Sequence, residues 1–589
     1  MAIESSGRIM VRVPRTQFHA LMMAPRLGAT AGPGSTRPLF AAMHAAGFVT
    51  QTHKPAEQQK DWLLHRLPPD ERNPWDVAHE LVRGKAQGAA HLVGSPELYA
   101  EPDLLLPSRQ APQPPKAVRA ALAPRAKAPR KGPPYPPDDM LNKHYDPKSG
   151  SGFSPAWHLQ KDYGNFVGAW SQGKTRGAGI RIAHLDTGYT PEQASKPRNL
   201  HPEQGWNVSD DNADIIDRKH TAPWDMPGHG TATLALLAGN AVNIQFEANG
   251  PVYNGDLGGA PDASVVPVLI GSSVIHLYTA NVAQGLSYAL APHAGGPCDV
   301  VSLSHGGLPS NAWADAVNDL YEAGIVVVAA SGDSFNLKLV EIATHFTVYP
   351  SAFYRVVTAT GTTYAKGPYI ADDTGAMQGC WGPDAVMKKA IAAYTPNVPW
   401  MRYDDTPFGW DMDGGGTSAA TPQVAAACAL WLAKYGKQFP AGWTRVAACR
   451  HALFESVKNK GKDLAHIGVG MLDAGEMLSA ATLAKVTKAY KDGKLPHIEP
   501  DKVSNPFFRL LFGLPPPGSG VDEMYETEAA QLLFRSKNKE LVAAFEADPQ
   551  GQKKLSPQKA KRLRDAFIRE PAISNSLKTH LKAAAKDTK

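Results

Sequence analysis

An aspartate, a histidine and a serine occur in that order along the chain, each beside glycine. Asp186 closes an apolar run within residues 182–188, which end in Asp-Thr-Gly. His229 lies between two glycines, ahead of a run of small and apolar residues. Ser418 follows the stretch Gly-Gly-Gly-Thr at 414–417. These residue types suit nucleophilic catalysis, in which a serine attacks, a histidine takes its proton and an aspartate orients the imidazole.

Each of the three also has an ordinary structural interpretation. Asp186 suits a turn after a strand, and Ser418 suits the cap of a helix. A histidine at the entrance of a helix is disfavoured as an imidazolium, so His229 is suited to accept a proton. The lipase-type Gly-x-Ser-x-Gly elbow does not apply, because residue 420 is alanine. It is the combination and order of the three stretches that indicates a triad.

With this order of motifs, the segment from about 157 to 483 resembles the subtilisin-like serine proteases, the subtilase family. Residues 299–307 (Asp-Val-Val-Ser-Leu-Ser-His-Gly-Gly) resemble the strand that pairs with substrate, and 268–273 resemble the strand facing it. Residues 468–474 resemble the motif that closes the catalytic domain. The resemblance implies acyl transfer by Asp186, His229 and Ser418, with the Ser418 backbone N–H in the oxyanion hole. It further implies a substrate-binding site formed by Gly271, Ser304, His305, Gly306, Ala330, Ser331 and Gly332.

One position departs from the family pattern. Where the family has an asparagine that donates to the oxyanion, this chain has Asp333. An ionised aspartate only accepts hydrogen bonds, whereas a protonated one can donate like an amide. The resemblance leaves three interpretations: an acid-favouring or slow protease with a protonated Asp333, a site completed by a partner, or a neighbouring donor such as Asn336.

The elements that would position these residues follow from apolar patterning. Short apolar runs at 180–185, 264–269, 299–303 and 325–330 are typical of strands buried on both faces. Helical patterns lie at 231–237, 280–291 and 312–323. This alternation predicts an α/β fold with a doubly wound, mostly parallel sheet.

Composition divides the 589 residues into four segments. Residues 1–106 combine strand patterns at 9–13 and 48–52 with helical patterns at 38–47 and 74–84, which predicts a small α+β domain. Residues 107–139 form a linker, with ten prolines between 107 and 137. The catalytic domain is predicted over 140–484. Residues 485–589 form an α-helical extension, with amphipathic patterns at 524–546 and 557–568.

The resemblance suggests a role for the first of these segments. Residues 98–103 (Leu-Tyr-Ala-Glu-Pro-Asp) resemble the last strand of a subtilase propeptide. This implies a prodomain that acts as an intramolecular chaperone and inhibitor, and a chain made as a zymogen. An independent recognition domain is the alternative.

The charge distribution bears on the partners. The chain carries 61 Lys+Arg and 55 Asp+Glu, for a net charge of +6. Residues 551–589 contain eleven basic and three acidic residues, and 115–132 contain six basic residues and no acidic one. Both runs lack interleaved aromatic residues, so nucleic-acid binding is not expected, and solvated tails or linkers are favoured. The helical extension is a candidate docking element for a protein partner.

Further expectations follow from what the sequence does not contain. No run of about 18 apolar residues occurs, and the first residues lack a signal-peptide pattern, which makes a cytoplasmic location the default and leaves secretion by another route open. The four cysteines are expected to be buried apolar residues, because none lies in metal-binding spacing. No cofactor is expected for the chemistry. Structural calcium is possible, and the acidic loop 210–214 could bind it or simply be solvated.

The predicted function is a serine endopeptidase that cleaves protein or peptide substrates. A pseudoprotease that binds peptides without turnover is the alternative, and Asp333 is the residue that favours it. The intact triad favours the enzyme.

Overall fold

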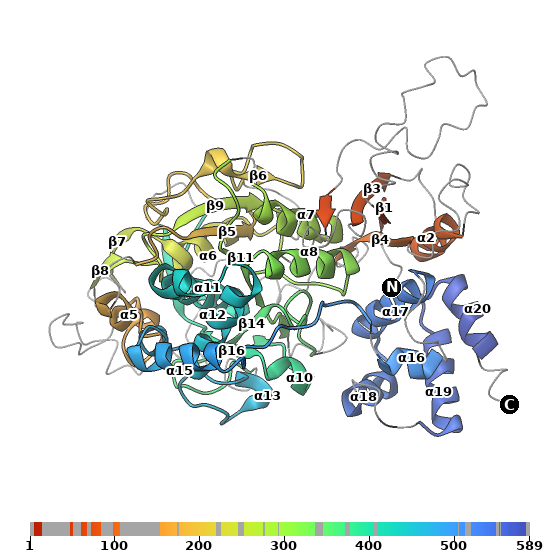
Figure 1. Cartoon of the computed structure of the whole chain (residues 1–589). Helices are drawn as coiled ribbons and strands as arrows, with labels where there is room; N and C mark the ends of the chain where they lie inside the picture. The colour runs from red at the N-terminus through yellow and green to blue at the C-terminus, as the bar shows by residue number, and fades with distance from the viewer. Residues whose placement is uncertain are drawn as a thin grey trace, which may run out of the picture.

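Three units pack against one another in the computed structural model (Figure 1). The N-terminal unit comprises described residues between 5 and 106, the central unit those between 154 and 504, and the C-terminal unit those between 506 and 584. The structure describes residues 5–14, 48–50, 60–66, 72–83, 98–106, 154–172, 176–218, 225–245, 252–274, 277–292, 294–335, 345–370, 377–403, 409–504, 506–512, 520–548, 553 and 555–584. The predicted helix at 38–47, the linker 107–139 and Asn336 lie outside the described residues.

A seven-stranded sheet forms the middle of the central unit, and all its neighbouring strands are parallel. Its order is β16 (Ala390–Tyr394), β14 (Val357–Thr362), β12 (Val326–Ala330), β11 (Val300–Leu303), β5 (Arg181–Asp186), β9 (Ser264–Leu269) and β6 (Trp206–Asn207). Strand β5 has residues in both hydrophobic cores, Ala183 and Leu185 in one and Ile182 in the other. This burial on both faces explains the near-continuous apolar runs of the sequence and confirms the predicted fold class.

Helices cover both faces of this sheet. The core that contains Ile182 is shared with α6 (His229–Ala238), α11 (Gly416–Tyr435), α12 (Trp443–Glu455) and α15 (Ala480–Lys491). The core that contains Leu185 is shared with α7 (Thr279–Leu290) and α8 (Asn311–Glu322). The remaining elements of the central unit are η2 (Trp157–Leu159), α5 (Phe166–Gln172), η3 (Pro202–Gln204), β7 (Ala241–Gln245), β8 (Val252–Asp256), β13 (Asp333–Phe335), β15 (Met377–Gly379), α10 (Asp384–Met387), β17 (Val398–Met401), β18 (Trp410–Gly414), η4 (Gly436–Gln438), α13 (Leu464–Ile467) and α14 (Ala474–Met477).

The N-terminal unit builds an antiparallel sheet that includes a strand of the central unit. Its order is β10 (Leu277–Tyr278), β4 (Tyr99–Leu106), β1 (Ser5–Pro14), β3 (Lys60–Arg66) and β2 (Phe48–Thr50), and β10 belongs to the central unit. Helix α2 (Pro74–Val82) packs against β4 and β1. The strand pattern at 9–13 is therefore confirmed, as are the described parts of the strand pattern at 48–52 (Phe48–Thr50) and of the helical pattern at 74–84 (Pro74–Val82); residues 51, 52 and 84 lie outside the described residues.

Two buried carboxylates of β4 cap the helices of the central unit. Glu101 accepts hydrogen bonds from the backbone N–H groups of Asn311 and Ala312, both at 3.1 Å, at the start of α8. Asp103 accepts one from the N–H of Ala280, at 2.7 Å, at the start of α7. Negative charge is favourable at a helix N-terminus, so these contacts attach β4 to both helices.

The C-terminal unit consists of helices, as predicted: α16 (Pro506–Phe512), α17 (Gly520–Arg535), α18 (Lys539–Ala547), α19 (Pro557–Ile568) and α20 (Asn575–Ala584). The pattern at 557–568 coincides with α19, whereas the pattern at 524–546 is divided between α17 and α18. The break comes from Asn538, whose side chain accepts from the N–H groups of Glu540 and Leu541 and begins a new helix there.

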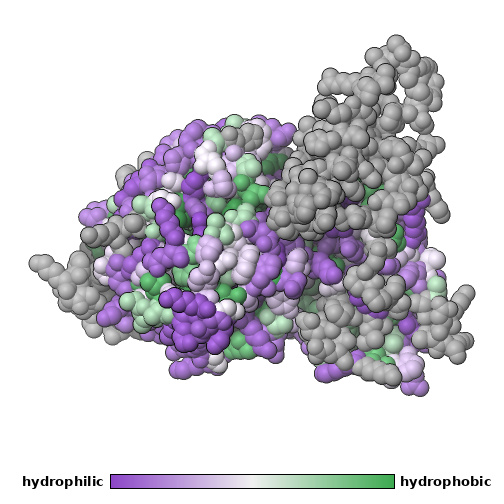
Figure 2. Space-filling view, in the orientation of Figure 1, coloured by the Kyte–Doolittle hydropathy of each residue, from purple (hydrophilic) through white to green (hydrophobic). Residues whose placement is uncertain are grey.

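Figure 2 shows mostly hydrophilic side chains over the visible face of the central unit, with hydrophobic residues scattered among them. The four cysteines are buried and unpaired, as expected. Within the described part of the chain, no helix is both long and apolar enough to cross a membrane.

Candidate active site

The side chains of Asp186 and His229 meet at the carboxyl end of the parallel sheet. Asp186 is the last residue of β5, and His229 is the first residue of α6. The Nδ1 atom of His229 lies 2.7 Å from Asp186 Oδ1, which also accepts the N–H of Thr187 at 2.8 Å. Thr233 donates to the other carboxylate oxygen at 3.0 Å. Asp186 is therefore fully hydrogen-bonded although it is completely buried.

The charge of Asp186 is maintained by its neighbours. Burial opposes ionisation, but the imidazoles of His229 and His305 and the hydrogen bond from His229 hold the pKa of Asp186 below its usual range. An ionised aspartate at Nδ1 fixes the tautomer of His229 with its Nε2 atom unprotonated. That atom is buried and has no hydrogen-bond partner within the described part of the chain.

Ser418 lies in the first turn of α11, and α11 packs against α6 (Figure 1). Its Oγ donates to the backbone oxygen of Ser304 at 3.3 Å, and Ser304 Oγ donates to the backbone oxygen of Ser418 at 3.0 Å. The serine hydroxyl is thus turned towards β11 instead of His229. Catalytic hydrogen bonds of free enzymes are often loose and tighten only with substrate.

A close approach of two glycines brings the histidine to the aspartate. A Cβ atom added to Gly230 would lie 2.2 Å from the backbone oxygen of Gly188. Gly188 follows Asp186 by two residues, and Gly230 follows His229 directly. Only glycine at position 230 lets α6 begin this near to the end of β5.

A buried aspartate that the sequence analysis missed ties these two segments together. Asp217 Oδ2 accepts from Thr187 Oγ1 at 2.8 Å and from the N–H of Gly228 at 2.7 Å. Thr187 Oγ1 in turn accepts from the N–H of Gly230 at 2.9 Å. Burial raises the pKa of Asp217 to about 7. Nothing in the residues around position 217 signals this role, since its partners are 11 to 30 residues away.

The Asp333 carboxyl group lies beside the residue that precedes Ser418. Its Oδ1 accepts from the N–H of Thr417 at 2.9 Å, and its Oδ2 lies 3.3 Å from Thr417 Oγ1. A Cβ atom at Gly416, where φ is +73°, would lie 2.8 Å from Asp333 Oδ2. Burial raises the pKa of Asp333 to about 6, against the opposing effect of the two hydrogen bonds from Thr417.

The predicted substrate-binding residues occupy two sides of this region. Gly306 follows β11, and its Cβ would lie 2.1 Å from a methyl group of Val348, so the position requires glycine. Ala330 ends β12, and the two residues after it bond within the chain. Ser331 O accepts from Val348 N at 3.0 Å, and Gly332 O accepts from Cys380 N at 2.7 Å.

On the other side, Gly271 is buried just beyond β9. The next residue, Ser272, accepts the N–H of Met226 at 3.0 Å, in the segment that leads to His229. Gly271 therefore lies close in the chain to a contact with the histidine segment.

His305 differs from the expectation of a pocket-lining side chain. Its imidazole is completely buried, and its Nδ1 atom lies 4.0 Å from Asp186 Oδ2. His184 of β5 lies on the same carboxylate, with Nε2 3.8 Å from Asp186 Oδ2 and 2.9 Å from Thr233 Oγ1. Burial lowers the pKa of both histidines to about 4, so both are neutral near pH 7. Only the backbone of His305 remains available for the predicted contact with substrate.

An aromatic residue beside His229 was also missed. The Trp400 ring, on β17, lies 5.6 Å from the His229 ring in an edge-to-face arrangement at 73°. It lies on the β17–β18 hairpin that precedes the nucleophile. Residues 398–401 (Val-Pro-Trp-Met) were not singled out, because nothing in this short apolar stretch signals a position next to a histidine far earlier in the chain.

In the acidic loop 210–214, considered above for calcium, two of the carboxylates bond to neighbouring residues. Asp210 accepts from the Asn207 side chain at 3.1 Å, and Asp214 forms an ion pair with Arg218 at 2.6 Å. Among the residues that the structure describes, no group of three or more His, Cys, Asp or Glu side chains is arranged to hold a metal ion.

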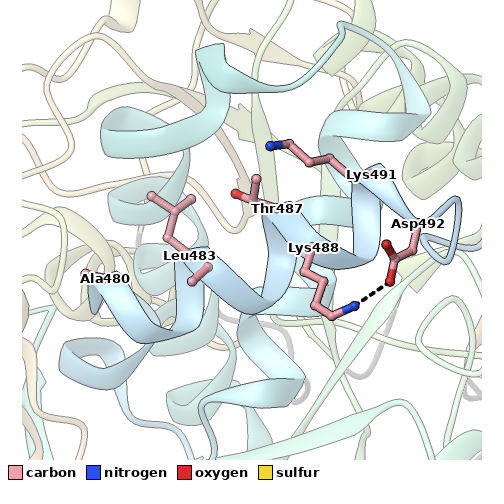
Figure 3. A pocket seen from close by; sticks show the side chains of 7 residues that line it. Ala480, Leu483, Thr487, Lys488, Lys491 and Asp492 are labelled. Atoms are coloured by element: carbon pink, nitrogen blue, oxygen red, sulfur yellow. Dashed lines mark hydrogen bonds and ion pairs between the residues drawn. The ribbon is translucent and has the colours of Figure 1, made fainter.

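A pocket of about 420 Å³ lies elsewhere, along α15 and the residue after it (Figure 3). Leu483 and Thr487 line it, and Lys488 pairs with Asp492 at 2.7 Å. It contains no residue of the triad, and all its lining residues come from 480–492.

A parallel sheet with the Asp186–His229 pair at the carboxyl ends of its strands, and Ser418 at the start of an adjoining helix, is the kind of arrangement that serine hydrolases with an Asp-His-Ser triad use. Residues 177–470 match the family described as the subtilase family. This segment of the chain therefore belongs to the subtilase family.

Individual relatives agree with this assignment. The chain is 29% identical over 268 residues to the minor extracellular protease Epr of Bacillus subtilis. The matched stretch covers 44% of this chain and 33% of that protein. It is 31% identical over 214 residues to subtilisin DY of Bacillus licheniformis, with 36% and 65% covered. It is 27% identical over 276 residues to subtilisin BL of Lederbergia lenta, with 47% and 82% covered. The chain thus spans only a third of the length of the first relative and just under two thirds of the second.

Proposed function

We propose that this chain is a serine endopeptidase that hydrolyses peptide bonds through an acyl-enzyme. Ser418 attacks the carbonyl carbon, His229 takes its proton and returns it to the leaving amine, and Asp186 stabilises the imidazolium. The observation that carries the proposal is the 2.7 Å contact between His229 Nδ1 and Asp186, which leaves Nε2 without a hydrogen-bond partner within the described part of the chain. No cofactor takes part in these steps.

The oxyanion would be stabilised by the Ser418 backbone N–H and by Asp333 in its protonated form. Asp333 Oδ1 accepts the backbone N–H of Thr417 at 2.9 Å, and Oδ2 accepts the Thr417 hydroxyl at 3.3 Å. We place the proton on Oδ2, because its hydrogen bond is the longer one and a hydroxyl group can rotate away, whereas a backbone N–H cannot. Since burial raises the pKa of Asp333 to about 6, the protonated form is populated in mildly acidic solution. The proposed enzyme is therefore most active below neutral pH.

The substrate would lie between the segment 304–306 and the segment 330–332, with its backbone along the residues after β11. Gly306 supports this position, since its N–H and C=O make no hydrogen bond within the described chain. The capping contacts of Glu101 and Asp103 support a role for the N-terminal unit as an attached prodomain.

Labelling with a fluorophosphonate probe tests the proposal. We expect wild-type protein to be labelled and Ser418→Ala not to be labelled. Ser171→Ala, which changes an exposed serine far from the site, should be labelled like wild type. If wild type remains unlabelled from pH 4.5 to pH 9, also after limited proteolysis within residues 107–139, the peptide-binding pseudoprotease replaces the enzyme as the proposed function.

A further inference from the structure

The C-terminal helices contact the N-terminal unit and the central unit at the same time. All three units contribute to one hydrophobic core, which contains Trp75 of α2, Trp313 of α8 and Leu533 of α17. Among the described residues, the large hydrophobic side chains that are exposed belong to the central unit and none to α16–α20. The apolar faces of the C-terminal helices are therefore turned inward.

Helix α17 bridges the two other units through polar side chains. Gln531 accepts from Trp75 Nε1 at 3.0 Å and donates to the backbone oxygen of Pro309 at 2.9 Å, just before α8. Thr527 Oγ1 lies 3.0 Å from the Tyr99 hydroxyl and accepts from Asn311 at 2.9 Å. Each of these two side chains thus joins an N-terminal residue to a central one.

An ion cluster adds a third bridge of this kind. Arg12 of β1 lies 2.5 Å from Glu523 of α17 and 3.5 Å from Asp315 of α8. Arg12 is buried. Because a buried charge without its partners is costly, removing α17 would leave Arg12 with weaker compensation.

Helix α20 contacts the first turn of α2, beside the Trp75 contact with α17. The Asp76 carboxylate accepts from the N–H of Asn575 at 3.0 Å and from the N–H of Ser576 at 2.9 Å, and so caps α20. The Asn73 side chain donates to the backbone oxygen of Ala572 at 2.9 Å. Helix α2 is thus covered on one side by its own sheet and on the other by α17 and α20.

The N-terminal unit therefore docks on two surfaces. Its strand β4 caps α7 and α8, and its helix α2 packs on α17 and α20. We propose that the C-terminal unit is a clamp that retains the N-terminal unit on the central unit after the segment between them has been cut. The partner of the C-terminal helices is then the first hundred residues of the same chain, which remain as a bound subunit instead of leaving as a released prodomain.

Docking on two surfaces favours retention of the cut N-terminal unit. Cutting a connecting segment removes an effective concentration of about 1 mM, so a unit held on one surface dissociates easily on dilution. A unit held on two surfaces has to break both sets of contacts together. A separated N-terminal unit would also expose Trp75 and His79, both completely buried here, and lose β10 from its sheet.

The clamp deepens the proposed function, since it governs how a prodomain would be removed, but its test does not need peptide hydrolysis. A recognition sequence for a site-specific protease is inserted into residues 107–139 of the full Ser418→Ala chain. The chain is cut, diluted in steps and analysed by gel filtration. We expect the N-terminal fragment to elute with the remainder at concentrations down to about 1 μM, well below the effective concentration that the linker supplied.

Two variants and one control test whether contacts with the C-terminal unit are what retain the cut N-terminal fragment. Asp76→Ala removes the cap on α20 and should raise the dissociation constant of the fragment about 10- to 100-fold. Trp75→Phe keeps an aromatic side chain but removes the indole N–H that bonds to Gln531 together with part of the buried ring, for an increase of about 3- to 10-fold. Glu80→Ala is the matched control, because Glu80 lies on the same helix and, within the described part of the chain, pairs only with exposed Arg72. It should stay within about twofold of the parent protein.

Either of two results overturns the clamp. The first is an N-terminal fragment that separates from the cut parent at about 10 μM, which is far below the effective concentration of a linked unit. The second is a dissociation constant for Asp76→Ala and Trp75→Phe no larger than that for Glu80→Ala. An uncut Asp76→Ala chain that fails to unfold cooperatively on heating is misfolded, and its dissociation constant is then not interpreted. In that case the dissociation constant of Trp75→Phe alone decides whether the clamp is kept. Fluorophosphonate labelling of Ser418 is measured separately, so a failed clamp and a failed protease assignment are distinguishable.

Discussion

At the scale of single residues, the active site combines groups whose ionisation is set by burial. Asp186 keeps its charge because imidazole and hydroxyl groups surround it, whereas Asp333 has, among the residues that the structure describes, only Thr417 as a hydrogen-bond donor. The pKa values of the two carboxyl groups are therefore shifted in opposite directions, downward for Asp186 and upward for Asp333. The same contrast separates a charge-stabilising role from a hydrogen-donating role.

This contrast predicts the pH dependence of the enzyme. A group whose pKa is about 6 is protonated below that pH, so the proposed donor is lost as pH rises through 6. Asn donates at every pH, so Asp333→Asn should keep kcat/KM on the alkaline side. At pH 8 the variant should exceed wild type by up to about 100-fold, since only about 1% of such a carboxyl group is then protonated. Asp333→Ala should lose about 100- to 1000-fold at the optimum. Identical alkaline limbs for wild type and Asp333→Asn would remove Asp333 from the proposed oxyanion site.

His305 gives a second prediction, about stability. Its folded pKa is about 4, below the roughly 6.5 of an unfolded histidine. The unfolded chain therefore binds a proton first, and stability that is complete above pH 6.5 is lost as pH falls towards 4. His305→Leu removes this loss, so the variant should lose about 2 kcal/mol less than wild type between pH 7.5 and pH 4.5. Urea unfolding at the two pH values measures the difference. His451→Leu is the control, since that ring is only half-buried and less affected.

At the scale of elements, apolar runs predicted four of the seven strands of the parallel sheet, β5, β9, β11 and β12, and the helices α6, α7 and α8, with small differences at their ends. Strands β6, β14 and β16 were not predicted. Strand β9 and helix α19 coincide with the predicted ranges 264–269 and 557–568. The division between α17 and α18 was not predicted, because the pattern of apolar residues continues across Asn538 while its side chain starts a new helix.

Only part of the candidate site could be predicted from the sequence, because contacts between distant segments leave no local pattern. Asp186 and His229 were predicted from their local glycine contexts, and the structure places them in contact. Asp217, Trp400 and the burial of His305 depend on segments distant in sequence that fold together, and no local pattern encodes them. The sharing of β10 with the N-terminal sheet is of the same kind, since two residues of strand carry no signal of their partner.

The glycine contact between α6 and β5 yields a prediction at this scale. Gly230→Ala places a methyl group against the Gly188 backbone oxygen and should displace His229 from Asp186. A displacement of about 1 Å costs roughly 100-fold in rate, so kcat should fall by about that factor. Gly436→Ala is the control, because its nearest neighbour is the flexible end of Leu432 at 3.3 Å. A Gly230→Ala enzyme with unchanged kcat would contradict the proposed importance of this contact.

At the scale of the whole molecule, the segment that leads from the central unit to the C-terminal helices is firmly attached. Asp501 accepts from the N–H groups of Tyr354 and Arg355, at 2.7 and 2.8 Å. Its own backbone exchanges hydrogen bonds of 2.8 Å with the side chain of Asn318 on α8. The C-terminal unit is thus anchored directly behind α8, the helix on which the N-terminal unit also docks.

Asp501→Ala should therefore destabilise the protein strongly. Removing one partner of a buried charged cluster costs about 3 kcal/mol or more, so the urea midpoint should fall clearly. Asp492→Ala is the comparison, because Asp492 pairs with the exposed Lys488 (Figure 3) and such surface pairs contribute about 0–1 kcal/mol. Equal midpoints for the two variants would show that the Asp501 contacts do not anchor the C-terminal unit.

The bridge from Tyr99 to Thr527 has a consequence for biosynthesis. The two residues are 428 positions apart in the chain, so a ribosome adding about 5–20 residues per second needs roughly 20 to 90 seconds between them. During that interval the first hundred residues exist without the helices that cover α2. A messenger truncated before codon 520 would yield a chain in which Trp75 stays uncovered, and quality-control chaperones bind such exposed aromatic surface. Translation through α17 is thus a condition for burying Trp75.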